Sequence, residues 1–405
     1  MKRIFAGQLL VAGDDGRCKL SPGFIRVDGE TIAEVVLGAV PSACDAGSLS
    51  TVICPGFVDA HLHLPQFDII GGHGLPLLTW LSELTFPAER RWADNDFAIS
   101  MIHRVLKQCI ANGTTSLFAY ASVHHSPAIS ALEIATQMGM SGAIGQVLMD
   151  REAPDDLCRD RNQLIDETSA LLDRFPSHAP MSAAVTPRFA ITCTNELLTD
   201  AGALAKSRNA YVQTHLSETI AECERVCHLF DGQSYVDVYR ATGILTDRSI
   251  MGHGIYLDRH DREILSHHGA ILAHCPTANS FLRSGSMRLN DTVNDRARVV
   301  LGSDIGAGYE RSMVRVGRAM IETASAIGEW FPTAANAWHQ ITAGNADRLG
   351  LTSRGRLVAG NVADLVFFEP DRPLDNSSVD PLSAMLFAWD DRWIKQVYLS
   401  GRRAY

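Results

Sequence analysis

Lysine is scarce in this sequence. Only five of the 36 basic residues in the 405-residue chain are lysines, namely Lys2, Lys19, Lys107, Lys206 and Lys395. Acidic residues number 46, so the formal net charge at pH 7 is −10. Nucleic-acid backbones and anionic membrane surfaces bind clusters of Lys and Arg. The acidic balance therefore argues against nucleic acid or a membrane as the main partner.

Long apolar runs and regularly spaced cysteines are also missing. No stretch reaches the roughly 20 apolar residues that a membrane-spanning helix needs. The N-terminal apolar run is broken by Gly7 and Gln8 and ends before Asp14, which argues against a signal peptide. The nine cysteines follow no repeated spacing, as is typical of reduced intracellular proteins. We therefore expect a cytoplasmic protein.

Gly-rich phosphate loops are absent too. Neither G-x-G-x-x-G nor a Walker-type sequence occurs, which disfavours a doubly wound nucleotide-binding sheet. Instead, short apolar runs alternate with amphipathic segments such as 96–111, 162–174, 195–208 and 258–268. The candidate strands are 52–60, 114–120, 141–149, 181–188, 211–216, 249–254, 270–275 and 299–304. Strands that alternate with helices over about 250 residues predict a (β/α)8 TIM-like barrel.

The two ends of the chain have a different pattern. Short alternating segments punctuated by Gly and Asp occupy the first fifty residues, and a similar pattern returns at 360–368 and 394–399. These segments are typical of β-hairpins. We predict that residues 1–54 and 355–405 together form a small β-sandwich domain, with the barrel domain, residues 55–354, inserted between them.

Polar side chains stand at the predicted strand ends, where barrel enzymes place their reactive groups. The first barrel strand ends in Asp59-Ala60-His61-Leu62-His63. Residues i and i+2 of a strand point the same way, so both imidazoles can face one ion. Taken alone, this H-x-H pair equally fits two histidines of a loop.

Three further strand ends favour the metal interpretation. His215, His253 and Asp304 close the predicted strands 211–216, 249–254 and 299–304. Each alone fits a polar residue hydrogen-bonded to a loop backbone, but all of them in register predict a site for a divalent ion. Imidazoles with one carboxylate suit zinc, and ferrous iron also fits.

The scarcity of lysine bears on the number of ions. Two-metal barrels of this type commonly need a carbamylated lysine as a bridge at the end of the fourth strand. The fourth predicted strand contains no lysine, and Lys107 and Lys206 fall on predicted helices. We therefore predict a single ion with these ligands: His61, His63, His215 and Asp304.

The segment Pro55–His63 resembles the first-strand motif of the amidohydrolase superfamily, and the resemblance extends over the whole chain. Within the superfamily the sequence is most similar to the guanine deaminases. The similar segments are His63–Gln66, Leu78–Leu81, Thr85–Glu89, Pro187–Ala190, His215–Glu218 and His274–Asn279. Of these segments, Thr85–Glu89 and Pro187–Phe189 best distinguish the guanine deaminases from other members of the superfamily. The sequence departs from the family pattern at two places. Ala278 stands where a small hydroxyl residue is common, and the segment 301–308 varies the usual ending of the eighth strand.

This resemblance implies hydrolytic deamination of guanine at C2 to xanthine and ammonia, by hydroxide that one metal ion activates. It implies that Asp304 is both a ligand and the acceptor of the water proton, and that His253 orients the hydroxide. Glu218 is implied to protonate ring N3. For Glu218 the alternative is a surface carboxylate at a helix start.

Recognition of the purine base is implied for Gln66, Trp80, Phe86, Arg188 and Phe189. Arg188 offers a fork of donors to a ring carbonyl, whereas Gln66 both donates and accepts. Trp80 and Phe86 alternatively pack their loop onto the barrel rim. His274 ends the seventh strand. Since four ligands are already assigned, we expect it to support the ligands or the fold rather than to bind the ion.

Other functions share parts of this pattern. The same metal site would serve a deaminase or chlorohydrolase acting on a pterin, 8-oxoguanine or an s-triazine. A non-catalytic binding scaffold requires lost ligands, and all of them are present. The zinc deaminases with H-x-E and P-C-x-x-C are excluded because neither pattern occurs. The family further implies a homodimer.

Overall fold

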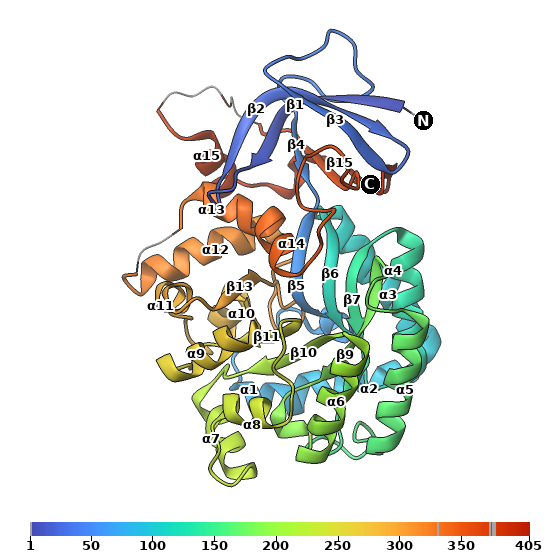
Figure 1. Cartoon of the computed structure of the whole chain (residues 1–405), viewed down its shortest axis with the longest axis vertical. Coiled ribbons are helices and arrows are strands. Elements are labelled where there is room, and N and C mark those ends of the chain that lie inside the picture. The colour runs from blue at the N-terminus through green and yellow to red at the C-terminus, as the bar shows by residue number, and fades with distance from the viewer. Residues whose placement is uncertain (1, 330–331, 372–373, 375–377) are drawn as a thin grey trace.

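The computed structural model describes residues 2–329, 332–371, 374 and 378–405. Figure 1 shows a sheet containing both chain ends at one end of the molecule, and strands surrounded by helices at the other. Within the described ranges, no helix is both long and apolar enough to cross a membrane.

The N- and C-terminal segments build one seven-stranded sheet. Its strands are β1 (Lys2–Ala12), β2 (Cys18–Asp28), β3 (Thr31–Leu37), β4 (Val52–Pro55), β14 (Leu365–Phe368), β15 (Ile394–Leu399) and β16 (Arg402–Arg403). They lie in the order β16-β15-β14-β4-β1-β2-β3, so the pair β4–β14 joins the two chain ends. Side chains such as Phe5, Ile25 and Phe367 form a separate hydrophobic core in this domain. The predicted β-domain is thus present, while its limits at residues 54 and 355 stay a prediction.

The central segment forms a nearly closed barrel of parallel strands. They are β5 (Phe57–His63), β6 (Thr114–Tyr120), β7 (Ser141–Gly145), β9 (Met181–Pro187), β10 (Tyr211–Leu216), β11 (Ser249–His253), β12 (Ile271–His274) and β13 (Arg298–Leu301). β8 (Val147–Leu148) pairs with β9 only. Every residue of β5, β6 and β9 is buried, as expected for parallel strands that are covered on both faces.

Helices surround this barrel and cover its rims (Figure 1). The α-helices are α1 (Leu77–Trp80), α2 (Phe86–Arg90), α3 (Asn95–Ala111), α4 (His125–Met138), α5 (Arg161–Arg174), α6 (Asn195–Arg208), α7 (Ile220–Leu229), α8 (Tyr235–Ala241), α9 (Arg259–His268), α10 (Pro276–Phe281), α11 (Leu289–Asn294), α12 (Met313–Ala326), α13 (Ala334–His339), α14 (Asn345–Arg348) and α15 (Pro381–Phe387). Short 3-10 helices are η1 (Leu64–Ile69), η3 (Arg91–Ala93), η4 (Ala190–Thr192) and η6 (Asp391–Trp393), and π-helical turns are η2 (Leu81–Thr85) and η5 (Gln340–Gly344).

Local sequence signals set the helix ends. α9 begins with a capping box in which Asp258 and Asp261 accept from each other's backbone N–H groups. It ends at Gly269, whose φ of 70° lies in the left-handed region that glycine adopts without strain. Such signals explain why the predicted segments 96–111, 162–174, 195–208 and 258–268 nearly coincide with α3, α5, α6 and α9.

The first and last barrel strands are linked by a buried side chain. Asn345 Nδ2 donates to the carbonyls of Val58 on β5 and Leu301 on β13, each at 2.8 Å. Its Oδ1 accepts from the Leu301 N–H at 2.9 Å. Asn345 is fully buried, so these bonds hold together the two strands that carry the H-x-H pair and lead to Asp304.

The predicted strands are largely found, with two corrections. The expected strand 52–60 divides at Gly56 into β4, which belongs to the terminal sheet, and β5, which begins the barrel. Thr115 lies so close to Gly56 that a Cβ there would come within 2.0 Å of its hydroxyl. The expected strand 141–149 is interrupted after Gly145. These breaks escaped prediction because they depend on neighbouring strands rather than on the local apolar pattern.

Candidate active site

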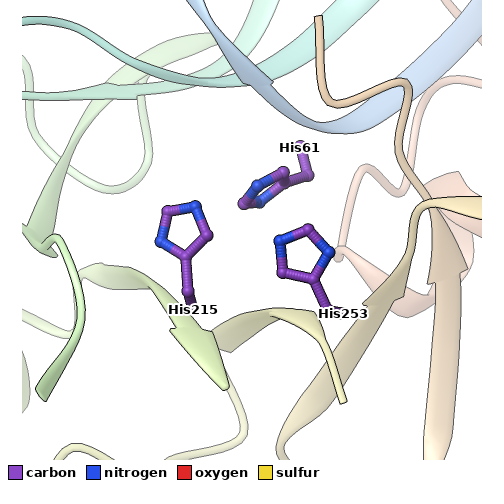
Figure 2. A group of neighbouring side chains, drawn as sticks. All are labelled: His61, His215 and His253. Atoms are coloured by element: carbon purple, nitrogen blue, oxygen red, sulfur yellow. The ribbon is translucent and has the colours of Figure 1, made fainter. Parts of the chain in front are cut away.

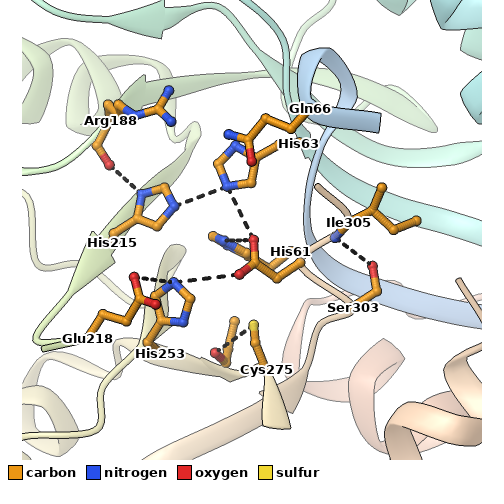
Figure 3. A network of polar contacts seen from close by, with 12 residues as sticks. His61, His63, Gln66, Arg188, His215, Glu218, His253, Cys275, Ser303 and Ile305 are labelled. Atoms are coloured by element: carbon orange, nitrogen blue, oxygen red, sulfur yellow. Dashed lines mark hydrogen bonds and ion pairs between the residues drawn. The ribbon is translucent and has the colours of Figure 1, made fainter. Parts of the chain in front are cut away.

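Four barrel strands direct imidazole and carboxylate groups to one place at their C-terminal ends (Figure 3). His63 Nε2 lies 3.1 Å from His215 Nε2. Asp304 Oδ1 lies 3.5 Å from His61 Nε2 and 3.4 Å from His63 Nε2. His253 Nε2 lies 3.9 Å from Asp304 Oδ2. The structure therefore brings together the four predicted ligands and His253.

Hydrogen bonds orient two of these histidines. The Nδ1 of His215 lies 2.6 Å from the carbonyl of Arg188, and the Nδ1 of His253 lies 2.8 Å from Asn279 Oδ1. Because both partners are acceptors, Nδ1 carries the proton in each ring. The Nε2 atoms of both rings consequently point toward the centre of the cluster. Such hydrogen bonds from the second ring nitrogen are usual around metal-bound histidines.

The backbone at the site is strained and crowded. His253 and Asp304 have φ values of 72° and 52°, in the left-handed region that non-glycine residues rarely adopt. Strain of this kind concentrates at functional sites, where the surrounding structure over-determines the conformation. Gly252 leaves room for the imidazole of His61, since a Cβ at position 252 would lie 2.6 Å from His61 Cε1.

Burial keeps three imidazoles in the form that binds metals. Burial, the largest cause, lowers the pKa of His61, His63 and His215, and the effect is strongest for the last two. Neutral imidazole is the form that binds a metal ion. Both nitrogens of His61 and both carboxylate oxygens of Asp304 are buried without a hydrogen-bonding partner in the part of the chain that the structure describes. A divalent ion would satisfy such atoms.

The electrostatic environment of His253 differs from that of the other histidines. Its burial lowers the pKa, but the negative charges of Glu218 and Asp304 outweigh this, so that the pKa is raised overall. His253 Nε2 lies 3.4 Å from Glu218 Oε2. Ring nitrogens of His253, His61 and His215 lie within 4.8 Å of one another, so these three histidines also form a possible set of metal ligands. Figure 2 shows the three rings around a common space. The ion pair with Glu218 nevertheless favours a charged rather than a ligating imidazole.

Glu218 lies between β10 and α7, as the sequence predicts. Its side chain is buried, which raises the pKa of its carboxyl group and makes a protonated form accessible. Ser284 Oγ donates to Glu218 Oε1 at 2.6 Å, leaving Oε2 on the side of His253. A carboxyl group held in this way is suited to proton transfer.

A pocket opens beside the histidine cluster. Its lining combines the metal-type side chains with apolar and polar groups, namely His63, Gln66, Leu77, Trp80, Leu81, Arg188, Phe189, His215, Glu218, Glu222, His253, Asp304 and Ala307. Four of the five residues predicted to recognise a base are therefore in this lining. The fifth, Phe86, packs against the Arg188 guanidinium, whose carbon lies 5.6 Å from the ring centroid.

The chain is similar in sequence to known proteins. Residues 52–404 match the model of the amidohydrolase family. This chain belongs to the amidohydrolase family. Within the family it is guanine deaminase-like: the guanine deaminase of Escherichia coli (strain K12) is 34% identical over 365 residues, which cover 87% of this chain and 83% of that protein.

Solved structures of amidohydrolases agree with the fold. A structure of E. coli guanine deaminase has a TM-score of 0.93 at 29% identity and covers 100% of this chain and 99% of its own. A structure of guanine deaminase from C. acetobutylicum with bound guanine in the active site has a TM-score of 0.91 at 27% identity and covers both chains fully. The amidohydrolase family implies a divalent metal ion. The buried nitrogens of His61 and carboxylate oxygens of Asp304, which have no hydrogen-bonding partner among the described residues, are suitable ligand atoms for such an ion.

The lysine positions agree with the expectation for this amidohydrolase. β9, the fourth strand of the barrel, contains no lysine, whereas Lys107 lies on α3 and Lys206 on α6. Arg188, which follows β9, is one of the residues that line the pocket. His274 ends β12 and is buried, and its Nδ1 has no hydrogen-bonding partner among the residues that the structure describes. Burial lowers the pKa of His274 to about 3. Its predicted supporting role stays a prediction.

Several residues of the site were not predicted. Ser284 and Asn279 hold Glu218 and His253 by hydrogen bonds, and Glu89 holds Arg188 and Gln66. Glu222 accepts from the Glu218 N–H at 2.7 Å, and burial together with Glu218 raises its pKa to about 7. Asn279 and Glu89 lie in segments that carried the family resemblance, so those motifs were the available signal. Ser284 had none.

Proposed function

We propose that this protein deaminates guanine hydrolytically, producing xanthine and ammonia. One observation carries the proposal. Arg188 and Gln66 line the same pocket as the histidines and Asp304 of the proposed metal site. The 34% identity to the E. coli guanine deaminase and the similarity to a guanine-bound structure support it.

The metal site in this proposal holds a single divalent ion through His61, His63, His215 and Asp304. Zinc suits three imidazoles with one carboxylate best, and ferrous iron is the alternative. When bound, such an ion acts as a Lewis acid and lowers the pKa of water from about 16 toward 7. The absence of lysine from β9 supports one ion rather than a bridged pair.

The surrounding side chains handle the protons. Asp304 accepts a proton from the attacking water, while His253, fixed by Asn279, stabilises the charge that develops during the attack. Glu218 donates a proton to ring N3, which becomes more basic as C2 turns tetrahedral. The raised pKa of Glu218 is consistent with this acid role. Asp304 then passes the proton it took from the water to the amino group, so that the C2–N bond breaks and ammonia leaves. The C2 hydroxyl proton returns to Glu218 as the carbonyl of xanthine forms.

Base recognition falls to the other side of the pocket. Arg188 donates to the ring carbonyl O6, and Gln66 hydrogen-bonds to the neighbouring edge of the purine. Phe189 and Trp80 provide apolar walls that exclude water from the reacting atoms. Phe86 acts through Arg188, against which it packs. We further propose a cytoplasmic homodimer, which is the family expectation.

A substrate panel tests the proposal. Purified protein loaded with zinc or ferrous iron is incubated with guanine, a pterin, 8-oxoguanine and an s-triazine, and the ultraviolet change and released ammonia are measured. We expect guanine to be converted to xanthine with the highest kcat/KM. Turnover of another ring without turnover of guanine would contradict the proposed substrate, and a protein that binds no metal would instead indicate a binding scaffold.

A further inference from the structure

A buried carboxylate, Glu89, lies behind the polar side of the pocket. It belongs to α2 and is only 1% exposed. Both of its oxygens accept from Arg188 Nη1, at 2.6 and 2.9 Å. Its Oε1 also accepts from Gln66 Nε2 at 3.2 Å. One carboxylate therefore contacts both polar side chains that we propose for recognition of the base.

Glu89 fixes the orientation of the Gln66 amide. A carboxylate only accepts hydrogen bonds, so Gln66 must turn its NH₂ group toward Glu89 and its oxygen away. Within the described ranges this Oε1 is buried without a hydrogen-bonding partner, and Gln66 lines the pocket beside His63 (Figure 3). A ligand N–H in the pocket would remove the cost of leaving that oxygen unpaired. Gln66 is thus left as an acceptor.

The Glu89 carboxylate also determines which N–H groups Arg188 can donate to a ligand. Both contacts with Glu89 use Nη1, so the other guanidinium N–H groups remain for an acceptor on the ligand. The buried ion pair also balances the positive charge of Arg188. A buried arginine without such a partner would favour anionic ligands. The paired arginine instead suits a neutral carbonyl oxygen.

We infer that Glu89 is a positioning residue that sets the hydrogen-bond polarity of the pocket and so selects neutral rings with a lactam edge. In a cyclic lactam a carbonyl oxygen stands beside a ring N–H, which matches a donating Arg188 and an accepting Gln66. A ring amidine, with an amino group beside a bare ring nitrogen, presents the reverse pattern. The inference rests on the proposed function, because it concerns the same substrate site.

The variant Glu89→Gln tests this role, since glutamine both donates and accepts and no longer fixes the Gln66 amide. Guanine and 2,6-diaminopurine carry the same 2-amino group but differ at the lactam edge. The kcat/KM for guanine divided by that for 2,6-diaminopurine therefore reports the hydrogen-bond polarity of the pocket. We expect that ratio to fall by about tenfold or more, mainly through the KM for guanine, with the bound metal unchanged. Glu89→Asp should restore part of the preference. The control is Glu83→Gln, at an exposed carboxylate of the same connection.

Binding measurements separate this inference from the proposed function. Calorimetry with hypoxanthine, a lactam, and adenine, an amidine, needs no turnover. We expect the wild-type chain to prefer hypoxanthine and Glu89→Gln to lose most of that preference. An unchanged preference in a folded variant overturns the inference, as does a wild-type chain that binds both bases equally. A clear preference without any guanine turnover would instead contradict only the proposed function.

Discussion

The two sides of the pocket are built in different ways. The metal-facing side takes its side chains from the ends of β5, β10 and β11 and from Asp304, three residues beyond β13. The base-facing side takes Gln66, Trp80 and Glu89 from the connection between β5 and α3, and Arg188 from the turn after β9. Strand ends thus supply most of the metal-facing side, and the connection after β5 supplies most of the base-facing side.

The two sides also differ in how their polar atoms are satisfied. On the metal-facing side, the ring nitrogens of His61 and the carboxylate oxygens of Asp304 are buried and have no hydrogen-bonding partner among the described residues. On the base-facing side, Glu89 pairs with Arg188, and Trp80 Nε1 donates to the carbonyl of Gly72 at 2.7 Å. Among the described residues, only the Oε1 of Gln66 is left buried and unpaired in this group of side chains. Substitutions on the first side should therefore abolish the chemistry, whereas those on the second should change affinity and selectivity.

The largest effect is expected for His215→Ala. The variant lacks one proposed ligand, so metal binding and turnover should both be lost, as they should be after chelation of the wild-type protein. Elemental analysis and the guanine assay measure these properties. His228→Ala removes an exposed histidine from α7 and serves as the control. An unchanged metal stoichiometry in His215→Ala would contradict the ligand assignment.

Glu218→Gln should separate chemistry from metal binding. Glutamine can still accept from Ser284 but cannot deliver a proton, so kcat should fall by about 10²–10⁴ while the metal is retained. Steady-state kinetics together with elemental analysis measure both effects. Glu224→Gln, at an exposed position of α7, is the matched control. Normal activity would remove Glu218 from the proposed mechanism.

Arg188→Lys tests the base-facing side. Lysine keeps the charge but lacks the planar fork that contacts both Glu89 and a ring carbonyl. We expect kcat/KM for guanine to fall by about tenfold or more, chiefly through KM, with metal content unchanged. A fall in kcat at constant KM would place Arg188 with the metal-facing side instead.

The smallest effect is expected for Trp80→Phe. This change removes the hydrogen bond to Gly72 but keeps an apolar wall. A bond of this kind contributes about 1 kcal/mol, so in a 405-residue chain the melting temperature should fall by only about 1 °C, and KM should rise only a few-fold. Thermal unfolding and kinetics measure the two effects. A loss as large as that of Arg188→Lys would show that the indole contacts the base more closely than we propose.

The sequence by itself determined the barrel, the terminal β-domain and the metal-facing side. Alternation of strands and helices places all strand ends on one rim, so a polar residue at the end of each strand is brought to the same place by the fold class alone. His61, His63, His215 and Asp304 could therefore be grouped before any distance was known.

The tertiary structure decided the base-facing side and the supporting hydrogen bonds. Glu89 and Ser284 lie in connections whose paths depend on packing rather than on a repeating pattern, and Ser284 reaches Glu218 across 66 residues of sequence. The scarcity of lysine could be read from the sequence, but not that Arg188 would follow the lysine-free strand and be held by Glu89. The local sequence specifies which groups are available, and only packing specifies which of them meet.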